Sequence, residues 1–458
     1  QSSKCVRVVL DMAEESDGFE ALGYGKDCYC YRNSYVQYLG ESREDKQIVE
    51  SRYARAAAAI GAADFLLIGV GAGMGVDSGL ATYNDVAEVD CWRNRGHTYD
   101  TLCRPQLLES DPADFFGFWG HCFDSYRNTT PHEGYSILKK WCEEKDSNAK
   151  RSNALLGVES RCPRNHFVYS SNVDGHFIKA GFDPNVVLEI HGECDRWFCN
   201  ICASESALLS LVRPVDAFRF EINPATMRLD EDETADDTRS SEMPFTPGCW
   251  PRCPLLHPPT ATSELGSSHM MSPLMRPAVQ MFSENSSGLL AHLKREEERY
   301  IRWECAMENA VMGADETSEK PDEKSKTQEK RVVILEVGCG LRVPSVRMEM
   351  EEVFRDLLDK LARRATETGQ ASSLSDGDGT ERSRERMLSR LMERVTFVRI
   401  NPDFPQIPLS HVSERRPVHS EAEVAWTQQS VSIQETALEA LRGIDRHLAS
   451  SHELTAQR

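Results

Sequence analysis

An apolar run that ends in closely spaced glycines constrains the fold of this chain more than any other feature. Residues 65–68 read FLLI, and a polar turn follows the glycines at Gly69, Gly71, Gly73 and Gly75. A short apolar run predicts a buried strand, and glycines after a strand let a phosphate approach the backbone. The strict G-x-G-x-x-G spacing is absent, because Met74 and Val76 occupy the third glycine positions. The loop is therefore predicted to be a tight turn or a generic phosphate-binding turn.

Near-continuous apolar runs alternate with helical patterns along the rest of the chain. The strand-like runs are residues 65–68, 166–171, 185–191, 277–282, 332–338 and 395–401. The helical patterns cover residues 111–126, 132–145, 345–361 and 433–448. Apolar runs without polar alternation are typical of parallel strands that are covered on both faces. We therefore predict an α/β fold with a Rossmann-like, doubly wound parallel sheet, whose ligand lies at the carboxyl ends of the strands.

Four polar stretches interrupt this pattern. They are residues 204–246, with the acidic run DEDETADD, and residues 254–273, 314–330 and 363–386. Each contains too few apolar residues to offset the conformational entropy that ordering would cost. We predict that all four are disordered or loosely packed insertions.

Charge and cysteine content limit the partners and the compartment. With 53 basic and 73 acidic residues, the net charge of −20 repels nucleic acid and attracts basic peptides, so no direct nucleic-acid partner is expected. Residues 54–76 are apolar enough to suggest a membrane span, but Arg55, Asp64 and four glycines argue against one. The 15 scattered cysteines, an odd number, favour a reducing intracellular compartment, cytoplasm or nucleus, over a disulfide framework.

Polar side chains follow two further predicted strands. SSNVDG, residues 170–175, contains Asn172 and Asp174, and EIHG, residues 189–192, contains His191. The carboxyl ends of parallel strands meet at one edge of a sheet, so these three side chains and the glycine loop are expected to share a cleft. A histidine in that position favours catalysis over a purely structural role.

A group of cysteines predicts a zinc site. Cys199 and Cys202, in CNIC, have the spacing of one half of a zinc knuckle. The second half has two alternatives: Cys249 with Cys253, in GCWPRC, or Cys253 with His257. We predict a zinc ion bound by Cys199, Cys202, Cys249 and Cys253, with His257 as the alternative fourth ligand.

Taken in order, these motifs resemble the sirtuin family. The matching segments are GAGMGVDSGLATYN at 71–84, SSNVD at 170–174, HG at 191–192, the two-part cysteine group, RPAVQMFSE at 276–284, GCGLRVPS at 338–345 and IN at 400–401. The resemblance extends over residues 54–448 outside the insertions. It implies a Rossmann domain of two segments, 51–192 and 276–450, and a small zinc-binding module at 193–275, after an N-terminal extension at 1–50.

The resemblance also implies an activity and a set of site residues. A sirtuin is an NAD-dependent protein deacylase, so the implied partner is an acyl-lysine protein or peptide. His191 would be the general base towards a ribose hydroxyl, Asn172 would orient the ribose or a water, and Asp174 would hold the nicotinamide amide. The implied NAD-binding residues are Gly71, Ala72, Gly73, Tyr83, Asn172, Asp174, Gly338, Cys339 and Asn401.

Departures from the family motif leave alternatives open. Residues 81–84 read ATYN where the family has P-D-F-R. This loop favours an NAD hydrolase or ADP-ribosyltransferase on the same fold, or a non-catalytic NAD or ADP-ribose binding module, whereas His191 with Asn172 and Asp174 favours an enzyme. VVILEVGCG, at 332–340, is also similar to the first motif of methyltransferases that use S-adenosylmethionine, but Arg342 stands where that motif requires glycine.

Overall fold

The computed structural model describes residues 45–156, 164–205, 209–230, 244–254, 272–313, 330–372, 380–407 and 420–456. Among these residues, six strands form one parallel sheet in the order β3-β2-β1-β6-β7-β8. Their bounds are β1 Phe65–Val70, β2 His166–Ser170, β3 Val187–Glu189, β6 Val332–Val337, β7 Val395–Ile400 and β8 Ser430–Ile433. The predicted doubly wound α/β fold is confirmed. The strand order reverses between β1 and β6, which is where such sheets bind ligands.

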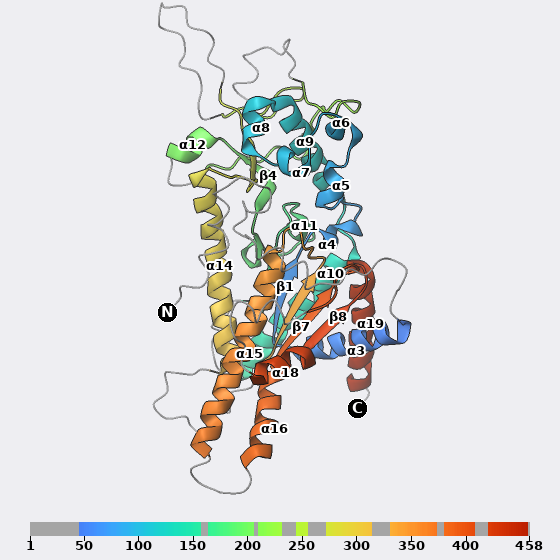
Figure 1. Ribbon diagram of the computed structural model, residues 1–458, viewed down its shortest axis with the longest axis vertical. Helices are drawn as coiled ribbons and strands as arrows, with labels where there is room; N and C mark the ends of the chain where they lie inside the picture. Colours follow the sequence, from blue (N-terminus) through green and yellow to red (C-terminus); the bar gives the residue numbers. More distant parts are fainter. Residues whose placement is uncertain are drawn as a thin grey trace, which may run out of the picture.

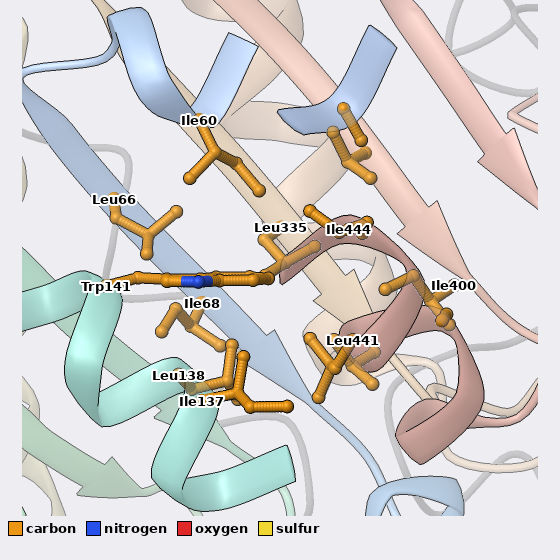
Figure 2. Packing of buried hydrophobic residues seen from close by; sticks show 14 of the residues in the cluster. Ile60, Leu66, Ile68, Ile137, Leu138, Trp141, Leu335, Ile400, Leu441 and Ile444 are labelled. Carbon is orange, nitrogen blue, oxygen red and sulfur yellow. The ribbon is translucent and has the colours of Figure 1, made fainter. Parts of the chain in front are cut away.

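Helices cover both faces of the sheet, as the apolar strands require (Figure 1). One face packs against α3 (Lys46–Ala62), α10 (Glu133–Leu156) and α19 (Ala437–Ala456). Leu66 and Ile68 of β1 point to this face, and Figure 2 shows them around the Trp141 ring of α10. The side-chain amine of Lys140 and the indole N–H of Trp141 both donate to Asp445 of α19, which joins the two helices.

The opposite face packs against α14 (Ser287–Met312), α15 (Ser345–Ser372) and α18 (Ser420–Gln428). Leu67, between the two residues that face the other way, belongs to this second core, so β1 is buried on both sides. The rings of Phe354 on α15 and Trp426 on α18 lie 4.8 Å apart. Helix α16 (Thr380–Met392) lies beside α15 and continues this layer.

A smaller lobe lies beyond the carboxyl ends of the strands (Figure 1). Its sheet pairs β4 (Gly192–Phe198) with β5 (Arg276–Val279) antiparallel. Its helices are α5 (Tyr83–Ala87), α6 (Asp90–Asn94), α7 (Tyr99–Leu102), α8 (Pro105–Ser110), α9 (Pro112–Asn128) and α12 (Asn200–Glu205). Aromatic side chains fill its core, among them Phe116, Trp197 and Phe220. Short elements at the sheet edge complete the fold: α4 (Gly73–Val76), α11 (His176–Lys179) and 3-10 helix η3 (Pro184–Val186).

Two predictions about individual elements are wrong. Residues 277–282 do not join the parallel sheet, because β5 pairs with β4, and the buried Arg276 side chain binds the buried Glu284 at 2.6 Å. The helical pattern at 433–448 begins only at Ala437, since Ile433 ends β8. Periodicity cannot separate a four-residue buried strand from the helix that follows it.

The insertions are partly ordered. Phe218 and Phe220 lie in the first predicted insertion, yet both pack into the aromatic core of the small lobe. The fourth is helical through Ser372 and again from Thr380. Residues 255–271 and 314–329, which make up most of the second and third, lie outside the described residues. Within the described part of the chain, no helix combines the length and the apolar character that crossing a membrane requires.

Candidate active site

Two glycine loops meet where the strand order reverses. The backbone N–H of Gly71 donates to the Val337 carbonyl at 3.0 Å, and that of Gly73 donates to the Gly338 carbonyl at 2.9 Å. A Cβ on Gly71 would lie 2.7 Å from Cys339 Cα, and one on Gly73 would lie 2.8 Å from Gly338 Cα. Glycine is therefore required here because the loop after β1 packs directly against the loop after β6. Gly338 itself has φ +66°, in the left-handed region that favours glycine.

Asn401, at the end of β7, holds the loop after β6 in place. Its side-chain amide donates to the Cys339 carbonyl at 2.9 Å, and its Oδ1 accepts from the N–H groups of Asp403 and Phe404, each at 2.9 Å. The Cys339 thiol is buried, and burial raises its pKa well above the ordinary value. The structure thus brings together Gly71, Gly73, Gly338, Cys339 and Asn401, five of the residues that the resemblance implies for NAD binding.

Asn172 connects the end of β2 to the first glycine loop. Its side-chain amide donates to the Gly71 carbonyl at 3.1 Å, and its backbone N–H donates to Ser170 Oγ at 3.1 Å. The side chain is buried at the sheet edge. Asn172 therefore lies against the predicted phosphate loop, at the point where β2 ends beside β1.

His191 is held in one tautomer by Ser171, which directly follows β2. Its Nδ1 lies 3.1 Å from the Ser171 carbonyl oxygen. A carbonyl oxygen only accepts hydrogen bonds, so Nδ1 carries the hydrogen and Nε2 of the neutral ring keeps its lone pair. Burial lowers the pKa of His191 below its ordinary value, although the hydrogen bond to Ser171 raises it in part. At neutral pH the ring is therefore uncharged, and Nε2 can accept a proton.

Asp174 lies beside a second carboxylate, Glu189, which the sequence analysis did not single out. Asp174 Oδ1 accepts from the His176 N–H at 2.9 Å, and Glu189 Oε1 accepts from the Gly175 N–H at 3.0 Å. Burial raises the pKa of both, and the charge of Asp174 raises that of Glu189 further. The available clue to Glu189 was an acidic residue at the end of an apolar strand, two residues before His191.

A cavity opens beside these residues. Four predicted site residues line it: Ala72, Asn172, Asp174 and His191. The small lobe contributes Tyr99 from α7, Phe118, Trp119, Cys122 and Tyr126 from α9, and residues 279–282 after β5. Tyr83 opens α5, but its side chain lies outside the described residues. The sequence analysis did not predict the small-lobe lining, because its residues lie far apart in the chain.

Three of the four predicted metal ligands come together in the small lobe. The sulfur atoms of Cys199, Cys202 and Cys253 lie within 4.8 Å of one another, with Cys202 and Cys253 at 3.5 Å. Cys249 is buried but is not part of this group, and His257 lies outside the described residues. Thiolates are preferred zinc ligands, so the three sulfurs suit zinc and leave the fourth ligand open. Cys199 directly follows β4 and His191 directly precedes it, so β4 separates this group from the cavity.

The comparisons with known proteins identify distant relatives. No family model matches the chain. The chain is 27% identical over 168 residues to NAD-dependent protein deacylase 2 of Pseudomonas syringae pv. tomato, a match that covers 35% of this chain and 59% of the relative. It is 25% identical over 157 residues to NAD-dependent protein deacylase 2 of Pseudomonas aeruginosa, covering 34% of this chain and 54% of the relative. The chain thus spans a little over half the length of these curated relatives.

Solved structures with similar architecture include a Sir2 homolog–NAD complex. The two chains are 13% identical, and the match covers 91% of this chain and 98% of the solved chain, with a TM-score of 0.40. A second is a Sir2 protein bound to an acetylated peptide, with 13% identity, coverage of 65% of this chain and 97% of its own, and a TM-score of 0.30.

Proposed function

We propose that this chain, a distant relative of the sirtuin-type NAD-dependent protein deacylases, is itself an NAD-dependent protein-lysine deacylase. One observation carries the proposal: His191 presents a neutral ring, with its Nδ1 hydrogen bound to the Ser171 carbonyl, to a cavity that Asn172 and Asp174 also line. A base whose tautomer is fixed in this way is suited to remove a proton from a hydroxyl group.

The dinucleotide would lie along the meeting point of the two glycine loops. The residues proposed to hold it are Gly71, Ala72, Gly73, Tyr83, Asn172, Asp174, Gly338, Cys339 and Asn401. The position of the cavity, where the strand order reverses, suits such a ligand. When bound, NAD supplies the ADP-ribosyl group that accepts the acyl group, with nicotinamide as the leaving group.

The chain's own residues then have separate tasks. His191 Nε2 accepts a proton from a hydroxyl in the cavity, and the Ser171 carbonyl stabilises the charged ring that results. Asn172 presents its side chain next to the first glycine loop and orients a hydroxyl or a water. Asp174 accepts a hydrogen bond from an amide. The aromatic side chains of α9 cover the cavity from the small lobe and exclude water from it.

Residues 193–275, one part of the small lobe, are proposed to be a zinc-binding module inserted in the dinucleotide-binding domain. Cys199, Cys202 and Cys253 would hold the ion, with Cys249 or His257 as the fourth ligand, and zinc there would add folding free energy. The proposed domain division is 51–192 with 276–450, and 193–275 for the module. β5, at the start of the second segment, pairs with β4 across that boundary.

Nicotinamide release from NAD tests the proposal, measured with and without an acetyl-lysine peptide. A deacylase releases nicotinamide only when the peptide is present, and the peptide loses its acyl group in equal amount. Release without the peptide would indicate an NAD hydrolase. Peptide-dependent release with ADP-ribose retained on the protein would indicate an ADP-ribosyltransferase. NAD binding without release would indicate a binding module, as the ATYN loop at 81–84 would suit.

A further inference from the structure

Gln280 lines the cavity and carries a buried polar group without a hydrogen-bond partner. Its side chain is only 7% exposed, yet its Nε2 has no hydrogen-bond partner among the described residues. Its backbone N–H donates to the His191 carbonyl at 2.7 Å, so the residue is fixed directly beside the proposed base. A buried amide without a partner destabilises a folded protein, and such a group calls for a specific explanation.

Trp119 shows the same feature from another element of the small lobe. It lies on α9, is 3% exposed and lines the same cavity. Its indole Nε1 also has no partner within the described ranges. An indole nitrogen can only donate, so it calls for a hydrogen-bond acceptor rather than a donor. Two residues that each carry a buried, unpartnered N–H donor thus line one cavity.

The described lining of the cavity offers no cationic side chain to an anionic acyl chain. It includes apolar side chains such as Phe118, Met281 and Phe282. Among the described lining residues there is no lysine or arginine, and Asp174 adds a carboxyl group. Arg342, next to Val343 of the lining, has its guanidinium 3.7 Å from the Asp100 carboxylate. A carboxylate on the ligand would therefore be desolvated without a cation to compensate it.

We infer that the cavity accepts a neutral acyl chain that carries a hydrogen-bond acceptor, such as a ketone oxygen, and that Gln280 determines this specificity. The inference rests on the proposed function, because it assigns the acyl group of the same substrate. The Gln280 amide donates to the acceptor, and the apolar side chains surround the rest of the chain. An acyl chain that lacks the acceptor leaves the amide unpaired, and a dicarboxylic acyl chain brings an uncompensated charge.

Three lysine peptides of one sequence test the inference: 4-oxopentanoyl, pentanoyl and succinyl. The first two differ only in a ketone oxygen that accepts a hydrogen bond, and the third carries a carboxylate. We expect kcat/KM for the 4-oxopentanoyl peptide to exceed that for the pentanoyl peptide by about tenfold, the effect of one buried hydrogen bond. The succinyl peptide should be the poorest of the three.

The variant Gln280→Met keeps the length of the side chain and removes the amide. It should bring the ratio of the 4-oxopentanoyl and pentanoyl values close to one, while Gln47→Leu, at an exposed position on α3, should keep the wild-type ratio. Gln280→Leu serves in the same way where Gln280→Met does not fold. A kcat/KM ratio near one in the wild-type protein would overturn the inference, and so would a wild-type ratio that is unchanged in Gln280→Met. In either case, peptide-dependent deacylation would still support the proposed function.

A measurement of peptide binding tests the inference even if the protein deacylates none of the peptides. If no peptide is deacylated, the proposed function fails, and calorimetric titration of the same peptides decides the inference alone. Binding of the 4-oxopentanoyl peptide about tenfold tighter than of the pentanoyl peptide, lost in Gln280→Met, supports it. Equal binding of the two, or binding of neither, overturns it.

Discussion

Glu336 and Arg399 lie directly opposite each other on β6 and β7, and their fully buried side chains form an ion pair at 2.6 Å. Arg399 also binds the buried Glu351 of α15 at 2.6 Å. One turn earlier on α15, Arg347 donates to the Cys339 carbonyl at 2.6 Å and lies 3.4 Å from Glu336. This buried network links the sheet and α15 to the glycine loop that follows β6.

Breaking this network should destabilise the whole fold. Arg399→Met leaves two carboxylates buried beside a single remaining arginine, and removing one partner of a buried pair costs about 3–5 kcal/mol. Denaturant unfolding measures the loss. Arg442→Met, which removes a solvent-exposed ion pair with Glu133, is the matched control and should leave the unfolding midpoint unchanged. Equal midpoints for the two variants would contradict this reading of the network.

The glycine loops should tolerate no side chain at their contact. Gly73→Ala puts a Cβ 2.8 Å from Gly338 Cα, a backbone atom that cannot move away without shifting the loop. We expect a loss of about 1–3 kcal/mol in the free energy of unfolding. Gly340→Ala is the control, because nothing lies within 4 Å of its Cβ position. If Gly73→Ala is as stable as the control, the close packing does not explain the glycine.

Removing the proposed base should separate chemistry from binding. His191→Ala should abolish nicotinamide release but leave NAD affinity within about tenfold, or 1.4 kcal/mol, because the loop backbone supplies most contacts with the dinucleotide. Titration calorimetry and a nicotinamide assay measure the two effects. His447→Ala, in the last helix, should behave as wild type. Unchanged turnover in His191→Ala would remove the functional assignment.

The pH profile should show an acidic limb set by His191. Burial lowers its pKa below 6.5, and only the neutral ring accepts a proton. Activity should therefore rise with pH below 6.5 and be level from about pH 7. The same shift affects stability: below pH 6.5 the unfolded chain binds a proton that the folded chain does not, so His191 lowers stability as the pH falls. A rate that still climbs between pH 7 and 8 would point to another base.

The three clustered cysteines should hold zinc. Cys253→Ser should lose the metal and lower the melting temperature, since a structural zinc ion contributes folding free energy. Elemental analysis of protein purified without chelators gives the zinc content. Cys305→Ser, at an exposed position on α14, is the control. Cys249→Ser decides the fourth ligand, because full zinc content in that variant excludes Cys249. A wild-type protein without zinc would refute the site.

Local sequence predicted the parallel sheet well. Strands β1, β2, β6 and β7 are near-continuous apolar runs, a composition that is typical of strands buried on both faces. The polar residues Asn172, Asp174 and His191 were recognisable for a related reason: each follows a strand, and parallel strands end at a common edge. The glycines at 71, 73 and 338 were also evident from the sequence. The main reason that glycine is required there was not evident, because it is the contact between two loops about 260 residues apart.

The amino-acid sequence alone determined most of the parallel strands and the side chains at their ends, because those properties depend on neighbours a few residues away. Tertiary structure alone decided that residues 276–279 leave the sheet for the small lobe, that Cys253 joins Cys199 and Cys202 without Cys249, and that Gln280 lies next to His191. Each of these contacts joins segments tens of residues apart. Their pairing depends on packing and hydrogen bonding across the whole fold, which no local pattern of residues records.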